Sequence, residues 1–263
     1  MKKIVTILLT LVLSLGVCFS FTACGTVEDV KAIKEKGKII VGITDYEPMD
    51  FLDETGKWIG FDAELAEKFA AELGVVCEFF EIVDWDNKVL ELNSNSIDVV
   101  WNGMTATEKL GKEIDFSVSY AKNAQVAVVK KGSTITANDV ETSTIAVEKG
   151  SAGDTTATPW SSATINRVGN QKDALMEVLA GESQIAIVDI TMAQSIVGKG
   201  ELAELQVLEG ATYGEEVFAV GLRKGSDLKE KLDAFLKEQY KNGTMTQLAA
   251  KYEVGLNIEA LTK

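Results

Sequence analysis

The chain contains no histidine among its 263 residues. Histidine is the side chain that most often transfers protons near neutral pH, and it is the commonest protein ligand of zinc and other transition metals. No Ser-Lys pair or cluster of metal-ligating residues takes its place. The sequence therefore predicts no catalytic residue, no metal site and no cofactor.

Positive charge is also scarce, because 26 lysines and arginines face 40 aspartates and glutamates. Only Arg167 and Arg223 carry a guanidinium group. The formal net charge of −14 repels nucleic acid and anionic membrane surfaces at long range. We therefore expect no nucleic-acid partner, and the acidity by itself indicates solubility rather than a particular ligand.

The amino terminus is typical of a secreted protein. Residues 1–23 combine Lys2 and Lys3 with the apolar run "IVTILLTLVLSLGV" and small residues before Cys24, which is the pattern of a signal peptide. The segment "TACG" resembles a bacterial lipobox. That resemblance implies an extracytoplasmic protein anchored to the cell membrane by diacylglycerol on Cys24 and a further acyl chain, such as palmitate. The alternative is a soluble secreted protein with a free Cys24.

The chain has too few cysteines for disulfide bonds to stabilise the fold. After cleavage at Cys24 and its lipidation, only Cys77 remains, so no intramolecular disulfide is possible. Cys77 lies in the apolar run "VVCEFFEI". We expect it to be a small buried hydrophobic residue rather than a nucleophile.

The first part of the chain alternates strands and helices. Residues 24–37 read as a spacer and a short helix, "KIIVGIT" as a strand, and "MDFLDETGKWIGF" as a hairpin. Asp62 is expected to cap the helix "AELAEKFAAEL". The strand "VVCEFFEI", a short helix near "NKVLELN" and the strand "IDVVW" follow. This order predicts a parallel sheet with helices on both faces.

A second unit follows the same plan, with strands at "TIAV" and "QIAIVD" and a helix at "QKDALMEVLAG". The last segment contains a strand and two helices that the second unit does not need. We therefore predict two lobes that the chain crosses twice: lobe 1 from 38–121 and 217–263, and lobe 2 from 122–216. Ligands of such folds bind in the crevice beyond the strand ends.

Four strand ends are predicted to meet at this crevice, at residues 44–46, 102–107, 150–153 and 189. Turns before helices, as at Gly103 and at "GSAGD", present N–H groups that bind anions such as a carboxylate. Asp45 and Asp189 would instead attract an ammonium group. Each feature alone is also explained as an ordinary helix cap, and their convergence favours a binding site.

Three aromatic residues are candidates for a wall of this site: Tyr46, Trp85 and Trp101. Trp101 ends a predicted core strand, so its side chain belongs either to the core or to the pocket. Trp85 stands in "DWDN" and has the alternative role of packing against the start of a helix.

The segments "GFDAELA", "GMTAT", "DFS", "IAIVD" and "GLRKGSDLKEKLDAFLKEQYKNGTMTQLAAKY" resemble the polar amino acid solute-binding proteins of ABC importers. The resemblance covers nearly all of the chain after Cys24. It implies an α/β type II periplasmic-binding protein fold, with mostly parallel sheets in two lobes joined by two hinge strands. It also implies lobe closure on a small ligand and delivery to ABC permease subunits.

The resemblance assigns roles to individual residues. Asp189 corresponds to the acceptor of the ligand ammonium group. The residues expected to contact the rest of the ligand are Asp45, Tyr46, Asn102, Gly103, Thr105, Ser151 and Ala152, with Trp85 and Trp101 as further candidates. One position departs from the family pattern: Leu110 stands where the arginine that binds the ligand carboxylate is expected. A lysine nearby, Lys109 or Lys112, cannot reproduce the bidentate geometry of arginine.

Two ligand classes follow from this departure: an α-amino acid held without the arginine, or a cationic or neutral solute that is not an α-amino acid. The leading function is solute binding by a monomer that serves an ABC importer. Two other functions remain open. One is a ligand sensor at the membrane, and the other is an enzyme similar to cyclohexadienyl dehydratases, which the absence of histidine disfavours.

Overall fold

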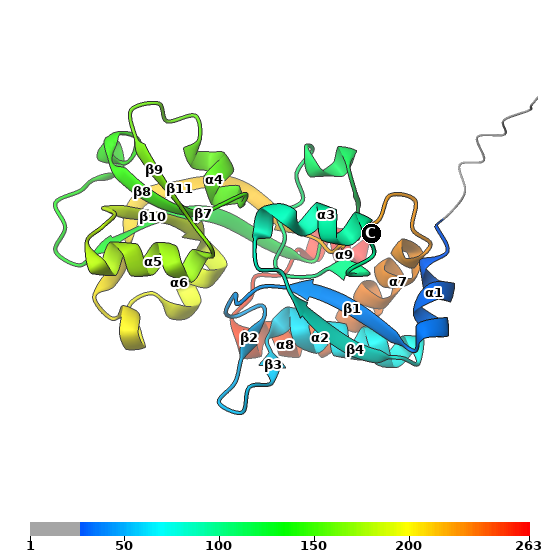
Figure 1. The fold of residues 1–263 in the computed structure, drawn as a ribbon. Helices are drawn as coiled ribbons and strands as arrows, with labels where there is room; N and C mark the ends of the chain where they lie inside the picture. Colours follow the sequence, from blue (N-terminus) through cyan, green and yellow to red (C-terminus); the bar gives the residue numbers. More distant parts are fainter. Residues whose placement is uncertain (1–26) are drawn as a thin grey trace, which may run out of the picture.

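The computed structural model describes residues 27–263. The predicted signal peptide and Cys24 lie outside the described residues. The chain forms two lobes, each built around a five-stranded sheet with helices packed against it (Figure 1). The predicted α/β fold with two lobes and two connecting strands is confirmed.

The sheet of the first lobe has the strand order β4-β1-β5-β12-β6. Its strands are β1 (Lys38–Ile43), β4 (Val76–Glu81), β5 (Val99–Val100), β6 (Asp115–Phe116) and β12 (Gly221–Leu222). Strand β1 pairs in parallel with β4 and β5, whereas β12 is antiparallel to both neighbours. The carboxyl ends of β1 and β5 therefore lie side by side, which places residues 44–46 next to residues 101–103. The predicted hairpin is formed by β2 (Phe51–Leu52) and β3 (Trp58–Ile59).

Helices cover both faces of this sheet. The α-helices of the first lobe are α1 (Asp29–Lys36), α2 (Phe61–Leu73), α3 (Lys88–Asn93), α7 (Leu228–Lys241), α8 (Thr244–Tyr252) and α9 (Ile258–Thr262). Short 3₁₀ helices occur at η1 (Trp85–Asn87) and η2 (Leu110–Lys112). The α2 side chain of Phe69 contacts Phe235 of α7 and Trp101, so one aromatic cluster joins both helices to the end of β5.

The sheet of the second lobe has the strand order β11-β7-β10-β8-β9. Its strands are β7 (Ala121–Lys130), β8 (Thr144–Glu148), β9 (Thr164–Val168), β10 (Ile185–Asp189) and β11 (Leu205–Phe218), and its helices are α4 (Ala152–Ala157), α5 (Gln171–Ala180), α6 (Ile190–Ile196), η3 (Ala137–Thr142) and η4 (Gly200–Leu202). Strands β8, β9 and β10 are parallel. Glu148 and Asp189 thus end two neighbouring strands at one edge of the sheet.

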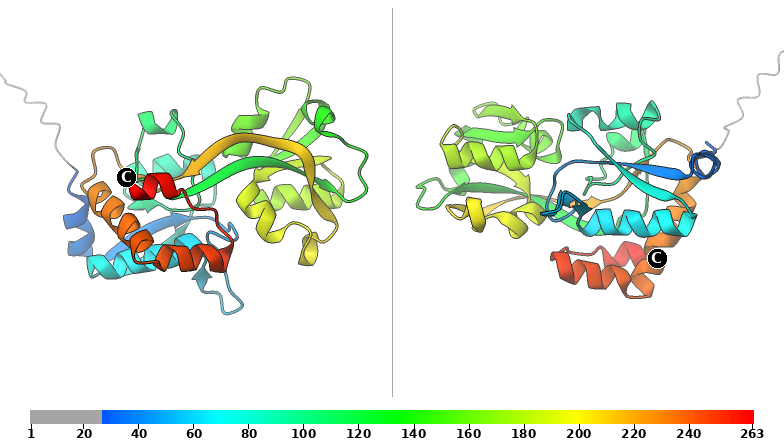
Figure 2. Two further views of the ribbon diagram at one scale, coloured as in Figure 1. Left: turned by 180° about the vertical axis from the view of Figure 1, so that it is seen from behind. Right: turned by 60° about the horizontal axis from the view of Figure 1, so that its bottom comes forward.

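The lobes are joined by β7 and β11, two long antiparallel strands that run side by side from one lobe to the other (Figures 1 and 2). Their pairing is interrupted between Val207 and Thr212 and again between Tyr213 and Glu216. The predicted lobe boundaries, 121/122 and 216/217, fall within these two strands. Hinge strands of this kind allow lobes to move as units while the sheets stay intact.

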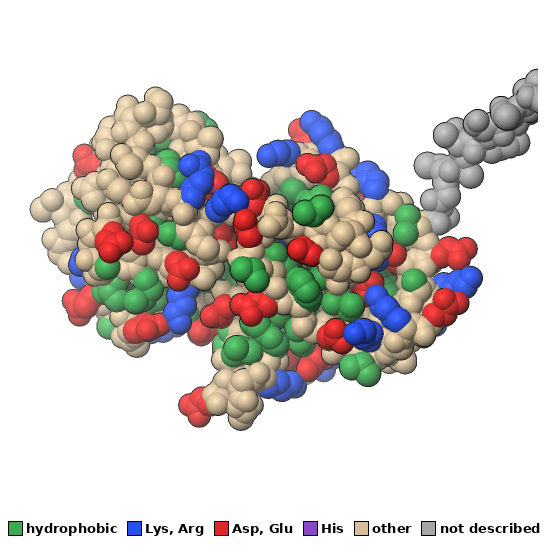
Figure 3. Space-filling view, viewed as in Figure 1, with side chains coloured by type: hydrophobic (Ala, Val, Ile, Leu, Met, Phe, Trp, Pro, Cys, Tyr) green, Lys and Arg blue, Asp and Glu red, His purple; other side chains and the backbone are tan. Residues whose placement is uncertain are grey.

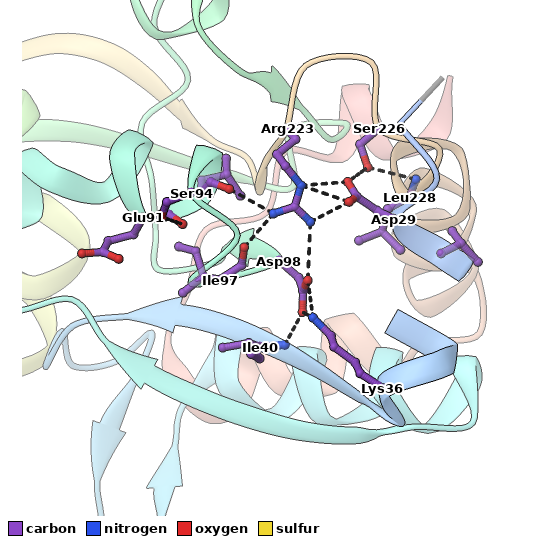
Figure 4. Close-up of polar contacts among 12 residues, drawn as sticks. Asp29, Lys36, Ile40, Glu91, Ser94, Ile97, Asp98, Arg223, Ser226 and Leu228 are labelled. Carbon is purple, nitrogen blue, oxygen red and sulfur yellow. Dashed lines mark hydrogen bonds and ion pairs between the residues drawn. The ribbon is translucent and has the colours of Figure 1, made fainter. Parts of the chain in front are cut away.

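Arg223 stabilises the far end of the first lobe rather than the cleft (Figure 4). Its guanidinium group is buried and donates to Asp29 at 2.7 Å and to the backbone carbonyls of Leu92 and Ile97 at 3.0 and 2.7 Å. Asp98 joins the network by accepting from Lys36. Of the two arginines in the sequence, only Arg167 is therefore near the interlobe cavity described below.

Two local expectations were wrong. Helix α2 begins at Phe61 with Gly60 in the N-cap position, so Asp62 is not its cap. Cys77 is only partly buried, because β4 is the edge strand of its sheet, although burial still raises the pKa of its thiol to about 12. Among residues 27–263, no helix is long and apolar enough to cross a membrane.

Candidate functional site

A cavity of about 600 Å³ lies between the lobes and is lined by both. Eight of the ten residues predicted to bind ligand line this cavity: Tyr46, Trp85, Asn102, Gly103, Thr105, Ser151, Ala152 and Asp189. The other two, Asp45 and Trp101, do not. This volume lies in the range of cavities that bind small molecules.

Asp189 lies on the floor of the cavity at the end of β10. It is 5% exposed, and its carboxylate accepts hydrogen bonds from the side-chain amides of Asn123, Gln125 and Gln171. Although Asp189 occupies the N-cap position of α6, its side chain does not cap that helix. Three amide donors therefore fix the carboxylate toward the cavity, where its negative charge remains available to a cation.

The pKa of Asp189 is raised to about 6, first by burial and then by the nearby Glu216 carboxylate, while the three amide donors oppose the rise. Glu216 lies on hinge strand β11 and accepts from the same Asn123 and Gln125 side chains and from Thr105. Its bond with Thr105 at 3.0 Å links the first lobe to the hinge. The ionised form of Asp189 is the major form at neutral pH.

The other predicted binding element of the second lobe is the start of α4. Ser151 is the N-cap residue, and its hydroxyl accepts from the Asp154 N–H at 3.1 Å. Ala152 is the first residue of the helix and lines the cavity. The first N–H groups of a helix have no partner within the helix, so this end of the cavity favours an anionic group.

The first-lobe wall is held by bonds that leave fewer free donors than the sequence predicts. The Gly103 N–H, expected to contact ligand, donates to the buried carboxylate of Asp62 at 2.6 Å. Asn102 exchanges two hydrogen bonds with Thr44 and so ties the end of β5 to the end of β1. No α-helix follows Thr105. Instead Thr107 accepts from the Leu110 N–H at the short helix η2.

Of the three aromatic candidates, two line the wall of the cavity and one lies in the hydrophobic core. Tyr46 and Trp85 line the cavity, and the buried Tyr46 hydroxyl has no hydrogen-bond partner among residues 27–263. Trp101 is 0% exposed and packs edge-on against Phe69, so it belongs to the core. Asp45 points to a second, smaller cavity beside Lys172, because the chain turns directly after β1.

Charged side chains meet where the two lobes approach each other (Figure 3). Lys149 of the second lobe lies 3.0 Å from Asp84 and 3.5 Å from Asp86 of the first lobe. Arg167 pairs with Asp154 at 2.8 Å within the second lobe. These exposed pairs contribute little free energy each.

Three buried polar residues that line the cavity are missing from the predicted binding residues: Lys88, Glu148 and Gln171. Each is at least nine-tenths buried. Gln171 is the first residue of α5, and it both donates to the Asp189 carboxylate and accepts from the Asp189 N–H. A polar side chain at a helix start is normally read as solvent-exposed, so no sequence signal distinguishes it. No cluster of metal ligands occurs in the described part of the chain.

Comparison with known proteins decides the family. Residues 39–255 match the model of the bacterial extracellular solute-binding proteins, family 3. The chain belongs to this family. Accordingly it is a solute-binding protein rather than an enzyme and acts outside the cytoplasm, as the sequence predicted.

Relatives with sequences similar to this chain are amino-acid-binding proteins. The arginine-binding extracellular protein ArtP of Bacillus subtilis (strain 168) is 29% identical over 253 residues, covering 94% of this chain and 98% of ArtP. The L-cystine-binding protein TcyJ of Escherichia coli (strain K12) is 30% identical over 230 residues, covering 84% of each chain. A mutant of ArgBP from T. maritima has a similar structure, with a TM-score of 0.80, 31% identity, and coverage of 85% of this chain and 98% of that one.

Proposed function

We propose that this solute-binding protein captures an α-amino acid between its lobes and delivers it to the permease of an ABC importer. The observation that carries the proposal is the Asp189 carboxylate, which is buried, faces the cavity and is oriented by three amide donors. A fixed buried anion of this kind recognises a cationic group. The relatives that bind arginine or L-cystine support an amino acid as the ligand.

In this proposal the ligand ammonium group binds Asp189, and its carboxylate binds at the start of α4. The Ala152 N–H and the Ser151 hydroxyl are the donors on the second lobe. Thr105 contributes from the first lobe through its hydroxyl oxygen, which can accept from the ligand ammonium group while its O–H donates to Glu216 beside Asp189. Tyr46 and Trp85 form the walls that contact the remainder of the ligand. The Gly103 N–H is not assigned to the ligand because Asp62 occupies it.

Capture is coupled to closure because residues of both lobes line the cavity. A ligand that touches Asp189 and Thr105 holds both lobes together, and the pairs of Lys149 with Asp84 and Asp86 form at the cleft edge. The hinge strands β7 and β11 accommodate the motion. The permease would then recognise the closed form, which differs from the open form in how the lobe surfaces are placed.

We also propose that the protein is a monomer anchored to the membrane by lipid on Cys24. The support is the sequence pattern around Cys24 and the spacer that follows it. Replacing Cys24 with serine should move the protein from the membrane fraction to the soluble fraction. Retention of the Cys24→Ser protein in membranes would contradict the anchor without affecting the proposal on ligand binding.

The binding proposal is tested by a thermal shift screen of the purified protein with amino acids, amines, peptides and sugars. A ligand that binds only the native state raises stability by RT ln(1 + [L]/Kd). We expect one or a few α-amino acids to raise the Tm of the wild type. Asp189→Asn should abolish that shift, whereas Glu113→Gln, which removes an exposed carboxylate from the cavity rim, should preserve it.

A second ligand class is favoured by one observation, the apolar Leu110 where the family pattern predicts an arginine. If the ligand has no carboxylate, amines or neutral solutes will raise the Tm in the same screen and amino acids will not. That result would overturn the assignment of the α4 helix start to a ligand carboxylate. It would leave solute binding itself intact.

A further inference from the structure

Lys88 is a buried cation at the edge of the ligand cavity. It is the first residue of α3, is 5% exposed, and lines the cavity. Its Nζ donates to the backbone carbonyls of Trp85 and Gly150, both at 3.1 Å, and lies 4.8 Å from the centre of the Trp85 ring. Lysine is seldom buried to this extent without a carboxylate partner.

No such partner is present. Among residues 27–263, no carboxylate oxygen lies within 4.0 Å of the Lys88 Nζ. Burial lowers the pKa of the Lys88 ammonium group, and the more distant carboxylates of Glu148, Asp86 and Asp84 only partly oppose this effect. A lysine ammonium group has three N–H donors, and the two carbonyls account for two of them. One N–H donor and the positive charge of Lys88 are therefore available to an anionic group in the cavity.

The position of this charge is informative. Gly150, which accepts from Lys88, immediately precedes Ser151 and Ala152 at the start of α4. The Lys88 ammonium group and the helix start therefore lie at the same end of the cavity, although they come from different lobes. Asp189 supplies the negative charge at the cavity floor.

Leu110 lies next to the same group of residues. Its side chain packs against an apolar cluster that contains Trp85, with Val89 also packed against it. Lys88 precedes Val89 in the chain, and Lys88 and Leu110 both line the cavity. The other lysine of this region that lines the cavity, Lys109, is exposed.

We infer that Lys88 binds the carboxylate of the ligand, in place of the arginine that Leu110 has replaced. This inference rests on the proposed function, in which the ligand is an α-amino acid. The ligand carboxylate takes the free N–H of Lys88 from the first lobe and the N–H groups of the α4 start from the second. Because both lobes contact one anionic group, the carboxylate itself bridges the lobes.

A lysine differs from an arginine in what it can select. Its ammonium group is a point charge without a planar fork, so it fixes the position of a carboxylate but not its orientation. Orientation then depends on the helix start. We expect the cavity to accept carboxylates in more than one orientation. Binding should therefore depend on a positive charge at position 88 more than on the shape of the side chain that carries it.

The test compares ligands that differ only in the carboxylate. Affinities of L-arginine and agmatine, and of L-lysine and cadaverine, are measured calorimetrically for the wild type, Lys88→Met and Lys109→Met. In Lys88→Met we expect the affinity for the amino acids to fall by about tenfold or more while the affinity for the amines stays within about threefold. Lys109→Met should change neither by more than about threefold. Lys88→Arg, which restores the charge, should recover most of the lost amino-acid affinity.

Unfolding curves of the ligand-free variants control for folding. Removing a buried charge that has no carboxylate partner should leave the ligand-free protein at least as stable as the wild type. Unchanged amino-acid affinity in Lys88→Met would overturn the inference. An equal loss for amino acids and amines would also overturn it, because Lys88 would then act only through its bond to Gly150. If the wild type binds no amino acid, neither in this assay nor in the thermal shift screen of amino acids, the proposed function is overturned and this inference with it.

Discussion

The buried Asp62 carboxylate accepts a hydrogen bond from the Gly103 N–H at 2.6 Å and another from the Tyr120 hydroxyl at 2.7 Å. Gly103 forms part of the cavity wall, and Asp62 is in the first turn of α2. A helix far from Gly103 in sequence therefore holds the cavity wall in place. The Gly103 turn also needs glycine, since its φ is +53° and a Cβ atom there would lie 2.6 Å from Tyr46.

Asp62→Ala should destabilise the protein and weaken ligand binding. The substitution leaves the Gly103 N–H and the Tyr120 hydroxyl buried without an acceptor, which costs on the order of 1–3 kcal/mol for each group. Asp62→Asn is the matched control, because its amide oxygen can accept both hydrogen bonds. Urea unfolding and ligand calorimetry should therefore rank wild type and Asp62→Asn above Asp62→Ala. Equal stability of the two variants would contradict an anchoring role for Asp62.

Gly150→Ala should hinder lobe closure. A Cβ atom on Gly150 would lie 2.7 Å from Asp86 Oδ1 and 2.9 Å from Asp86 Cβ, across the boundary between the lobes. The backbone of Gly150 also has φ of +71°, so alanine adds local strain. We expect ligand affinity to fall by about tenfold or more, and the liganded protein to have a larger radius of gyration by X-ray scattering than the wild type.

Gly132→Ala separates the strain from the clash. Gly132 has φ of +76°, but no heavy atom lies within 4 Å of a Cβ built there. Both alanine variants should lose on the order of 1 kcal/mol of stability, since each places alanine at positive φ. Only Gly150→Ala should lose affinity. Equal affinity in the two variants would show that the lobes do not need this close approach to hold ligand.

Ligand affinity should depend on pH through Asp189. Its pKa is raised to about 6, and an ammonium ligand binds the ionised carboxylate. Binding therefore releases a proton below pH 6, and affinity should fall by up to about tenfold per pH unit as the pH drops below this value. Calorimetry at pH 7 and pH 5 measures the effect. An affinity that does not change over this range would exclude Asp189 as the ammonium acceptor.

The sequence was informative where a local pattern sets the structure. The strand ends at Tyr46, Asn102, Ser151 and Asp189 were predicted to converge, and they line one cavity because their strands end at facing edges of the two sheets. Asp45 is one residue from Tyr46 but faces another cavity. The turn after β1 directs the two side chains to different cavities. An apolar strand pattern does not reveal at which residue the turn begins, so it cannot tell which of the two side chains faces the ligand cavity.

Tertiary packing decided the remaining cases. Trp85 and Trp101 both stand near predicted strand ends, yet only Trp101 meets Phe69 of α2 and is removed from the cavity. Lys88 belongs to the predicted short helix near "NKVLELN", with no prediction of burial. Its ammonium group donates to Gly150 of the other lobe, which is 62 residues away in sequence. Contacts between lobes have no periodic signature in the chain, so sequence patterns alone cannot predict them.

The ligand-free protein should become less stable as pH rises, because of Glu148. Burial and the Asp189 charge raise the pKa of Glu148 to about 8, and Lys88 only partly opposes this rise. The folded state therefore retains a proton between about pH 4.5, where the unfolded glutamate ionises, and pH 8. Because the folded state binds more protons than the unfolded state in this range, the free energy of unfolding decreases as pH increases through it.

Glu148→Gln cannot titrate at this position, so its free energy of unfolding should change less between pH 6 and pH 9 than that of the wild type. The difference should be roughly 1–3 kcal/mol, since each unit of pKa shift corresponds to about 1.4 kcal/mol. Urea unfolding of the ligand-free proteins at both pH values measures it. Glu113→Gln, which removes an exposed carboxylate from the same cavity, should follow the wild type. A wild-type pH dependence retained in Glu148→Gln would assign the effect to the other buried carboxylates, Asp50, Asp62 and Asp189.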